Sequence, residues 1–241
     1  MPAQATAAAS NTPVVPTATA SLSGTGSSSI DDNFMRADQT GWGTGTKPDG
    51  VPGVTWGIDG SGARPSVTIS NNVGVYGYPG VTNVVGIAAA GSTTYNGGDA
   101  LVKFSVSAVG HVTPYVVQNA CPDKSCYYGA RLHTSRNRLE VAKRAGNMTN
   151  ILASVPFTAA ANTIYWMRLH VTPGTSTTLQ ATVWADGAPE PSSWMVSTTD
   201  ASPLAANRVG TGGTWDGAGS GESIRYTWFA YAANGPASPP P

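Results

Sequence analysis

The sequence predicts an all-β protein, a two-sheet antiparallel β-sandwich of the jelly-roll kind. Apolar and polar residues alternate with the two-residue period of a half-buried strand, most clearly over residues 165–171 and 179–184. The 29 Gly and 18 Pro supply the many turns that short strands require. No window keeps a 3.6-residue apolar period, so we expect no α-helix. An open sheet of about a dozen strands would normally split into two packed layers.

The clearest strand pattern lies in the second half of the chain. A first strand over residues 165–171 ends at the sequence TPGT, whose residues favour a turn. A second strand covers residues 179–184 and ends near an Asp-Gly turn signal, and a third covers residues 194–198. Short turns join antiparallel neighbours, so we expect a three-stranded antiparallel unit with tryptophans spaced along it.

The other elements are shorter and follow from the same alternation. The ordered part begins at residues 30–36, and a Gly-rich loop with Trp42 and Trp56 follows. Further strands are expected over residues 66–75, 83–89, 99–109, 112–119, 127–133, 138–142, 151–156, 207–210 and 223–232. Pro114 lacks the amide N–H that a ladder uses, so it predicts a sheet edge or a bulge.

The composition excludes some partners. Charged residues make up 11% of the chain, about half the usual share, and the formal net charge is zero. A neutral chain has no electrostatic footprint for nucleic acid or an acidic membrane surface. No apolar run approaches the length of a transmembrane helix. We therefore expect no nucleic-acid partner and no membrane insertion.

Both ends differ in composition from the middle. Residues 1–29 are rich in Ala, Ser, Thr and Pro and carry no charge, which predicts a disordered linker. They also lack the basic and apolar regions of a secretory signal. Residues 30–234 form the predicted domain, and residues 235–241 are a Pro-rich tail or linker. Linkers at both ends are typical of a module from a longer polypeptide, and frayed termini are the alternative.

Two cysteines, Cys121 and Cys126, lie in the sequence CPDKSC. Two thiols cannot build a four-ligand structural zinc site, and the spacing is not that of a redox C-x-x-C motif. A local disulfide that closes a loop is the preferred interpretation, and a pair of reduced thiols in a turn is the alternative. A disulfide would place the protein in an oxidising compartment, outside the cell or at its surface.

Three blocks of the sequence resemble bacterial domains with the concanavalin A-like, or laminin-G-like, jelly roll. The first is DNFMR at residues 32–36 with the later GWG and TWG motifs, and the second is RLEV at residues 138–141. The third is YWMRLHV…ATVWADGAPEPSSW…TTD…NRVG, residues 165–210. The resemblance implies an extracellular jelly roll beside other modules, often one that binds carbohydrate or surface polymer. The last strand lacks an aspartate that such domains often carry, which weakens an inherited calcium site.

A catalytic site of the expected kind is missing. Glycoside hydrolases of this fold resemble one another in an E-x-D-x-E run, because two carboxylates must flank the scissile bond. The only glutamates here are Glu140, Glu190 and Glu222, and none has a carboxylate two residues away. Glu190 is instead expected to pair with Arg168 and fix its loop.

The tryptophans of the third block have two interpretations. Trp166, Trp184 and Trp194 are spaced along the predicted three-stranded unit. We expect them to pack structurally, and a platform that stacks on sugar rings is the alternative.

Calcium is the most plausible cofactor, in a structural role. It prefers several carboxylate and carbonyl oxygens, and Asp31 and Asp32 open the first strand. Two solvated carboxylates at a strand start are the equal alternative.

A candidate ligand-binding face lies on the strand over residues 127–133. Tyr127, Arg131 and His133 share one face of this strand, and the opposite face is apolar. Together with Gln118 from the preceding strand, these groups would stack on a sugar ring and bind its hydroxyls. An ordinary solvated sheet face is the alternative.

The leading hypothesis is a non-catalytic extracellular binding module that recognises a carbohydrate or a cell-surface polymer. The alternative is a structural or adhesive module, such as the subunit of a surface assembly, whose exposed strand edges pair between copies of itself. Neighbouring domains of a longer polypeptide are further candidate partners. A glycoside hydrolase with an atypical site is the least favoured hypothesis.

Overall fold

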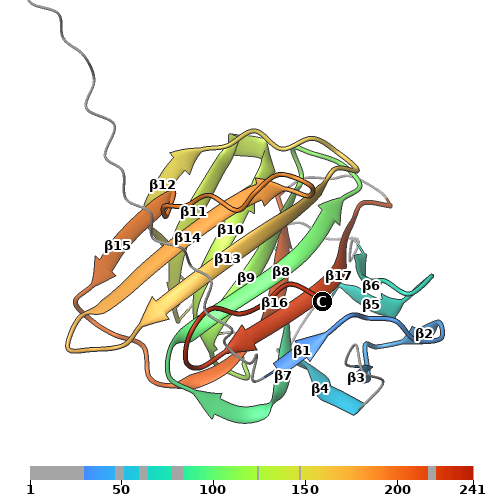
Figure 1. The fold of residues 1–241 in the computed structure, drawn as a ribbon, viewed down its shortest axis with the longest axis horizontal. Coiled ribbons are helices and arrows are strands. Elements are labelled where there is room, and N and C mark those ends of the chain that lie inside the picture. Colours follow the sequence, from blue (N-terminus) through green and yellow to red (C-terminus); the bar gives the residue numbers. More distant parts are fainter. Residues whose placement is uncertain are drawn as a thin grey trace, which may run out of the picture.

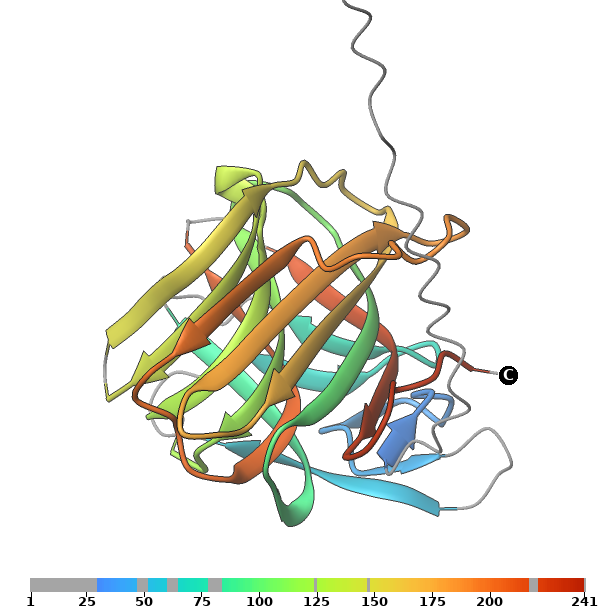
Figure 2. The same ribbon diagram turned by 60° about the vertical axis from the view of Figure 1, so that its left-hand side comes forward.

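Two antiparallel sheets pack face to face, which confirms the predicted β-sandwich (Figures 1 and 2). This computed structural model describes residues 30–46, 52–59, 65–77, 84–123, 125–146, 148–216 and 221–240. The predicted linker over residues 1–29 lies outside them. Within the described ranges no residue is α-helical, and one 3₁₀ turn, η1 (Thr134–Arg136), joins two strands. In the same ranges no helix has the length and apolar character needed to cross a membrane.

The nine-stranded sheet contains the stretch with the clearest sequence pattern. Its order is β15 (Val196–Asp200), β14 (Thr177–Ala185), β13 (Ile164–Thr172), β8 (Gly98–Val106), β17 (Ser223–Ala232), β6 (Gly74–Gly77), β5 (Ser66–Ile69) and β2 (Gln39–Thr40), with β1 (Ile30–Asp32) paired to β17. Strands β13, β14 and β15 are consecutive and antiparallel, so the predicted three-stranded unit is confirmed. It continues onto β8 and β17, which are more than a hundred residues apart in the sequence.

The eight-stranded sheet packs against it. Its order is β12 (Met148–Pro156), β11 (Arg138–Ala145), β10 (Cys126–His133), β9 (Val112–Ala120), β16 (Asn207–Trp215), β7 (Val84–Tyr95), β4 (Pro52–Asp59) and β3 (Thr44–Thr46). Strand β9 lies inside this sheet and its register is continuous at Pro114, so the expected edge or bulge there is wrong. The β9–β10 ladder begins only at Tyr115, so on that side Pro114 lies beyond it and the missing N–H removes no bond.

The core between the sheets is apolar and strongly aromatic. The inward side chains of β13 are buried, as their alternation predicted: Tyr165, Met167, Leu169 and Val171. Beside β1, the Phe34 ring lies 5.0 Å from Trp42 and 5.6 Å from Trp56 between ring centroids. Burying one such large side chain stabilises the fold by roughly 1.5–3 kcal/mol.

Polar side chains tie the two layers together through the core. The Tyr226 hydroxyl of β17 donates to the Gly212 carbonyl and accepts from the Tyr115 amide, both in the opposite sheet. Burial raises the pKa of the Tyr226 hydroxyl, so it stays a neutral donor. Such buried, satisfied hydrogen bonds fix one alignment of the sheets, because any other would leave these groups unpaired.

Cys121 and Cys126 form the predicted disulfide, which closes the loop between β9 and β10. The loop also has a backbone hydrogen bond of 2.9 Å from the Cys121 amide to the Cys126 carbonyl. No described cysteine remains a free thiol.

Candidate functional site

The face predicted to bind ligand is buried. Tyr127, Arg131 and His133 do lie together on the outer side of the eight-stranded sheet, but Tyr127 is fully buried and packs 6.0 Å from the ring of Tyr115. The guanidinium of Arg131 forms an ion pair with Glu140, with its Nε atom 2.7 Å from Oε2. The prediction that these side chains face solvent is therefore wrong, because they are buried and contact neighbouring side chains of the same sheet.

His133 belongs to the same buried network. Its Nε2 atom lies 3.4 Å from an Asp216 carboxylate oxygen, and its Nδ1 atom lies 3.0 Å from the Ser135 hydroxyl. Burial and the positive charge of Arg131 lower the pKa of the imidazole. His133 is therefore neutral at pH 7 and holds the β10–β11 connection in place.

Gln118 lies on the opposite side of the sheet from Tyr127. It is paired with Tyr128 in the β9–β10 register, and residues paired in this way share a face. Its amide nitrogen donates to the carbonyls of Gly98 and Leu169, at 3.1 and 2.8 Å, across the core. The prediction that Gln118 contributes to a ligand site is therefore wrong, and its role is to link the two sheets.

The aspartates predicted to hold calcium do not form a chelating pair. Asp31 and Asp32 are consecutive in β1, so their side chains point to opposite faces. The Asp32 carboxylate is fully buried and accepts two hydrogen bonds from Arg36, at 2.8 and 3.0 Å, and another from the Trp56 indole. Among the described residues no group of three or more acidic, His or Cys side chains is arranged for a metal. A cation at Asp32 would have to displace Arg36, so this site does not fit calcium.

A row of side chains crosses the outer face of the nine-stranded sheet. Trp184, Trp166, Lys103 and Trp228 come from the adjacent strands β14, β13, β8 and β17, and we call them the tryptophan row. The register pairs Trp166 with both Trp184 and Lys103, and Lys103 with Trp228. Paired residues share a face, and four adjacent strands at about 4.8 Å spacing extend over about 14 Å.

Stacking and ionic contacts order the row. The rings of Trp166 and Trp184 are nearly parallel, 15° apart with centroids at 6.3 Å, and the Lys103 ammonium lies 5.1 Å from the Trp166 ring centroid. Asp186 accepts from the Trp166 indole at 2.7 Å and pairs with Lys103 at 2.9 Å. Partial burial opposes ionisation of Asp186, but these donors outweigh it and lower its pKa. The carboxylate is therefore charged at neutral pH and fixes both partners.

An ion-pair network lies beside the row on the same face. Arg168 donates from Nε and Nη2 to the two Glu190 oxygens, at 2.6 and 2.9 Å, as the sequence predicted. A third nitrogen, Nη1, binds Asp99, whose other oxygen lies 3.2 Å from His170. The half-buried Trp194 stacks on the His170 ring at 5.7 Å, so it fixes the β14–β15 loop and lies outside the tryptophan row.

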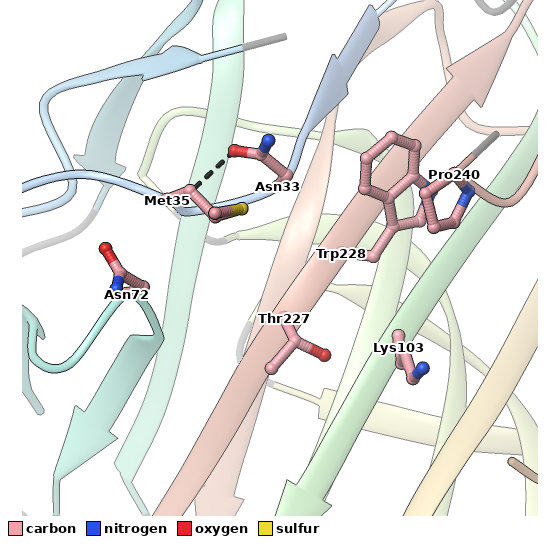
Figure 3. A pocket seen from close by; sticks show the side chains of 7 residues that line it. All are labelled: Asn33, Met35, Asn72, Lys103, Thr227, Trp228 and Pro240. Carbon is pink, nitrogen blue, oxygen red and sulfur yellow. Dashed lines mark hydrogen bonds between the residues drawn. The ribbon is translucent and has the colours of Figure 1, made fainter. Parts of the chain in front are cut away.

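An open hollow continues the row at its Trp228 end. It has a volume of about 420 Å³, and Figure 3 shows the residues that line it: Asn33, Met35, Asn72, Lys103, Thr227, Trp228 and Pro240. The lining combines an indole and a thioether with two amides, a hydroxyl and an ammonium. This mixture of apolar surface and hydrogen-bonding groups is typical of sites for small polar ligands.

Sequence reasoning missed Trp228 and Lys103. Simple alternation along β17 places Trp228 with Ile224 and Tyr226 in the core. A register shift between Tyr226 and Trp228 reverses the alternation, so Trp228 faces outward and Phe229 inward. The only signal in the sequence was the unbroken run of aromatic and apolar residues that the strand contains.

Comparison with known proteins gives fold likeness only. No protein-family model matches the chain, and no curated protein matches it. Among solved structures, the carbohydrate-binding module CBM66 from Bacillus subtilis is 10% identical, with a TM-score of 0.53, over 72% of this chain and 94% of its own. The Bacillus licheniformis β-glucanase is 15% identical, with a TM-score of 0.53, over 87% of this chain and 99% of its own.

These likenesses cover most of the chain. At such low identity they show the fold and no more. The chain therefore has the concanavalin A-like jelly roll that its sequence predicted, and a narrower laminin-G-like assignment stays a prediction.

Proposed function

We propose that this protein is a non-catalytic carbohydrate-binding module that holds a neutral glycan on the tryptophan row and in the adjoining hollow. The observation that carries the proposal is the alignment of three indoles on four adjacent strands, ending in an open hollow (Figure 3). The indoles themselves are only 3–9% exposed, so the hollow is where a glycan would first bind, and the row would have to be uncovered for the sugar rings to stack on it. The flat apolar face of a sugar ring stacks on an indole, and a row of indoles suits a chain of such rings.

The polar groups of the hollow complement sugar hydroxyls. The side-chain amides of Asn33 and Asn72 each offer a donor and an acceptor, and Thr227 offers a hydroxyl. Lys103 is already neutralised by Asp186, so the row presents little net charge. A zero formal net charge for the chain agrees with a neutral ligand. We therefore expect uncharged glycans to bind better than acidic ones.

The carboxylates near the row favour binding over hydrolysis. Asp99 and Glu190 both bind Arg168, and Asp186 binds Lys103 and the Trp166 indole. A glycosidase needs one carboxyl group as an acid and another as a base or nucleophile, each in reach of the bond. Carboxylates whose oxygens are engaged by cations in this way are not free to contact a scissile bond. Glu140, on the opposite sheet, is 2% exposed and pairs with Arg131.

The setting we propose for this module is extracellular, or at a cell surface. The Cys121–Cys126 disulfide supports it, because disulfides persist mainly in oxidising compartments. The fold likeness to a carbohydrate-binding module supports the function, although a fold alone hosts many functions. Neighbouring domains of a longer polypeptide would then be the partners that such a module delivers to a polysaccharide.

Isothermal titration with a panel of neutral oligosaccharides tests the proposal. Cellohexaose, laminarihexaose and xylohexaose are titrated into the full chain, with a uronic acid hexamer as the acidic comparison. We expect one neutral sugar to bind, and Trp228→Ala to weaken it about thirtyfold, the loss of about 2 kcal/mol typical of a buried aromatic anchor. Trp194→Ala, outside the row, is the matched control and should keep the affinity. The proposal fails if no neutral sugar binds, or if both variants weaken binding equally.

A further inference from the structure

The C-terminal segment does not leave the domain after β17. It turns back over the outer face of the nine-stranded sheet, beside β17 (Figures 1 and 2). We call Gly235–Pro240 the strap. Ala237 of the strap is 1% exposed and joins the apolar cluster that contains Trp166, Trp184 and Trp228. A segment whose composition predicted a linker is thus docked on the tryptophan row.

The sheet holds the strap through its backbone. The Ala237 amide donates to Asp99 Oδ1 at 3.0 Å, and the Ala237 carbonyl accepts from Arg168 Nη1 at 3.0 Å. The Trp228 indole donates to the Ser238 carbonyl at 3.2 Å. These three bonds involve three consecutive peptide units, from residue 236 to residue 239, and the side chain at position 237 needs only to be small. Asp99, Arg168 and Trp228 therefore form a receptor for an extended, uncharged peptide backbone.

The strap covers the surface that a glycan would need. The three indoles of the row are 3–9% exposed and share a buried apolar cluster with Ala237, and the strap is hydrogen-bonded to the row at Trp228. Pro240, at the far end of the strap, lines the hollow next to Trp228 (Figure 3). A proline ring there lies where the apolar face of a sugar ring would stack.

We propose that the strap is a displaceable internal ligand that competes with glycan for the tryptophan row. This inference rests on the proposed function for its biological meaning, and on the strap contacts alone for its structural part. Displacement is feasible because a sugar offers what the strap offers: an O–H that donates to Asp99 and an oxygen that accepts from Arg168. Burial of the strap is centred on Ala237, since Gly235 and Pro239 are exposed and Pro236 is partly exposed.

A pair of variants in the full chain separates strap release from other effects. Ala237→Glu places a carboxylate in a buried position beside Asp99, where like charge and desolvation drive the strap off the sheet. Pro239→Glu adds the same charge at an exposed position of the same segment and is the matched control. Hydrogen exchange of the amide at position 237, followed by NMR, reports the strap directly without any glycan.

We expect fast exchange at position 237 in Ala237→Glu and protection in the wild type and in Pro239→Glu. We also expect Ala237→Glu to bind one sugar of the neutral panel about tenfold more tightly, as happens when a competent state populated about a tenth of the time becomes fully populated.

Protection of the amide that persists in Ala237→Glu, or an unprotected amide in the wild type, contradicts the claim that the strap is docked on the sheet through residue 237. Fast exchange in Ala237→Glu with unchanged sugar affinity contradicts the proposal that the strap competes with glycan for the tryptophan row. Fast exchange with no sugar bound by any variant supports the docked strap and refutes the glycan function.

Discussion

Replacing Arg168 by methionine tests the ion-pair network that holds both the β13–β14 face and the strap. The Arg168 side chain is 5% exposed and binds Asp99, both oxygens of Glu190 and the Ala237 carbonyl. Methionine fills much of the same volume but leaves the Asp99 carboxylate, 3% exposed, without its strongest partner. Removing one partner of a buried ion pair lowers the free energy of unfolding by about 3–5 kcal/mol, mainly because the remaining buried charge is left without an opposite charge.

Urea unfolding at pH 7, followed by tryptophan fluorescence, measures the loss of unfolding free energy. We expect about 3–5 kcal/mol for Arg168→Met, or a fall in Tm of roughly 10 °C for a domain of this size. Lys103→Met is the matched control, because its ion pair with Asp186 is partly exposed and contributes about 1 kcal/mol or less.

The double variant Arg168→Met with Asp99→Asn separates the charge from the packing. It should recover much of the loss, because the amide carries no uncompensated charge. Equal losses in Arg168→Met and Lys103→Met, or a double variant worse than the sum of the single ones, would refute the reasoning.

Three further outcomes follow from other contacts. Burial opposes ionisation of Asp200, but hydrogen bonds from Lys143 and Tyr128 outweigh it and lower the pKa of this carboxyl. Its stabilising contribution is therefore complete above the unfolded-state pKa of about 4 and is lost as the pH falls through the lowered folded-state pKa, so the unfolding free energies of the wild type and Asp200→Asn should begin to converge only below about pH 4. Reducing the Cys121–Cys126 bond with dithiothreitol should cost about 2 kcal/mol in urea unfolding, the loop-closure value for so short a loop, and a Cys121→Ser, Cys126→Ser variant that does not respond to the reductant is the control. Calcium should raise Tm by less than about 1 °C, since Arg36 fills the Asp32 site, and a rise of several degrees that EDTA reverses would contradict that geometry.

The strand unit from β13 to β15 could be predicted because one of its faces is uniformly apolar and packs in the core between the sheets. Alternation then marks every inward residue, and a one-residue slip would expose the whole set. The same stretch gave the Arg168–Glu190 pair, because a charged side chain within a sheet needs a partner and Glu190 was near in sequence. In both cases the residues that constrain one another lie close together in the sequence, so the sequence alone is sufficient to predict the arrangement.

The face of β10 could not be predicted, because alternation separates two faces but does not say which of them meets solvent. Tyr127 and Arg131 were placed on the correct side of the strand, yet that side is buried as well. Their partners, Tyr115 and Glu140, come from neighbouring strands, and only the register brings them together. Gln118 was misplaced for a related reason, since the β9–β10 register decides its face.

The tryptophan row depends on pairings between strands that are far apart in sequence. Lys103 and Trp228 are paired across β8 and β17, more than a hundred residues from each other, and a register shift turns Trp228 outward. No local pattern reports such a shift. The strap was missed because its composition resembles a linker, and only its backbone contacts with Asp99 and Arg168 reveal that it is docked.

The central claim is that the tryptophan row binds glycan, and the indole N–H resonances test it most directly. In an NMR titration of Ala237→Glu with the three neutral hexasaccharides, the indole signals of Trp166, Trp184 and Trp228 should shift with one of them. Those of Trp42 and Trp215, fully buried in the core, should stay in place. Row signals that stay fixed with every sugar while the amide at position 237 exchanges freely would contradict the claim.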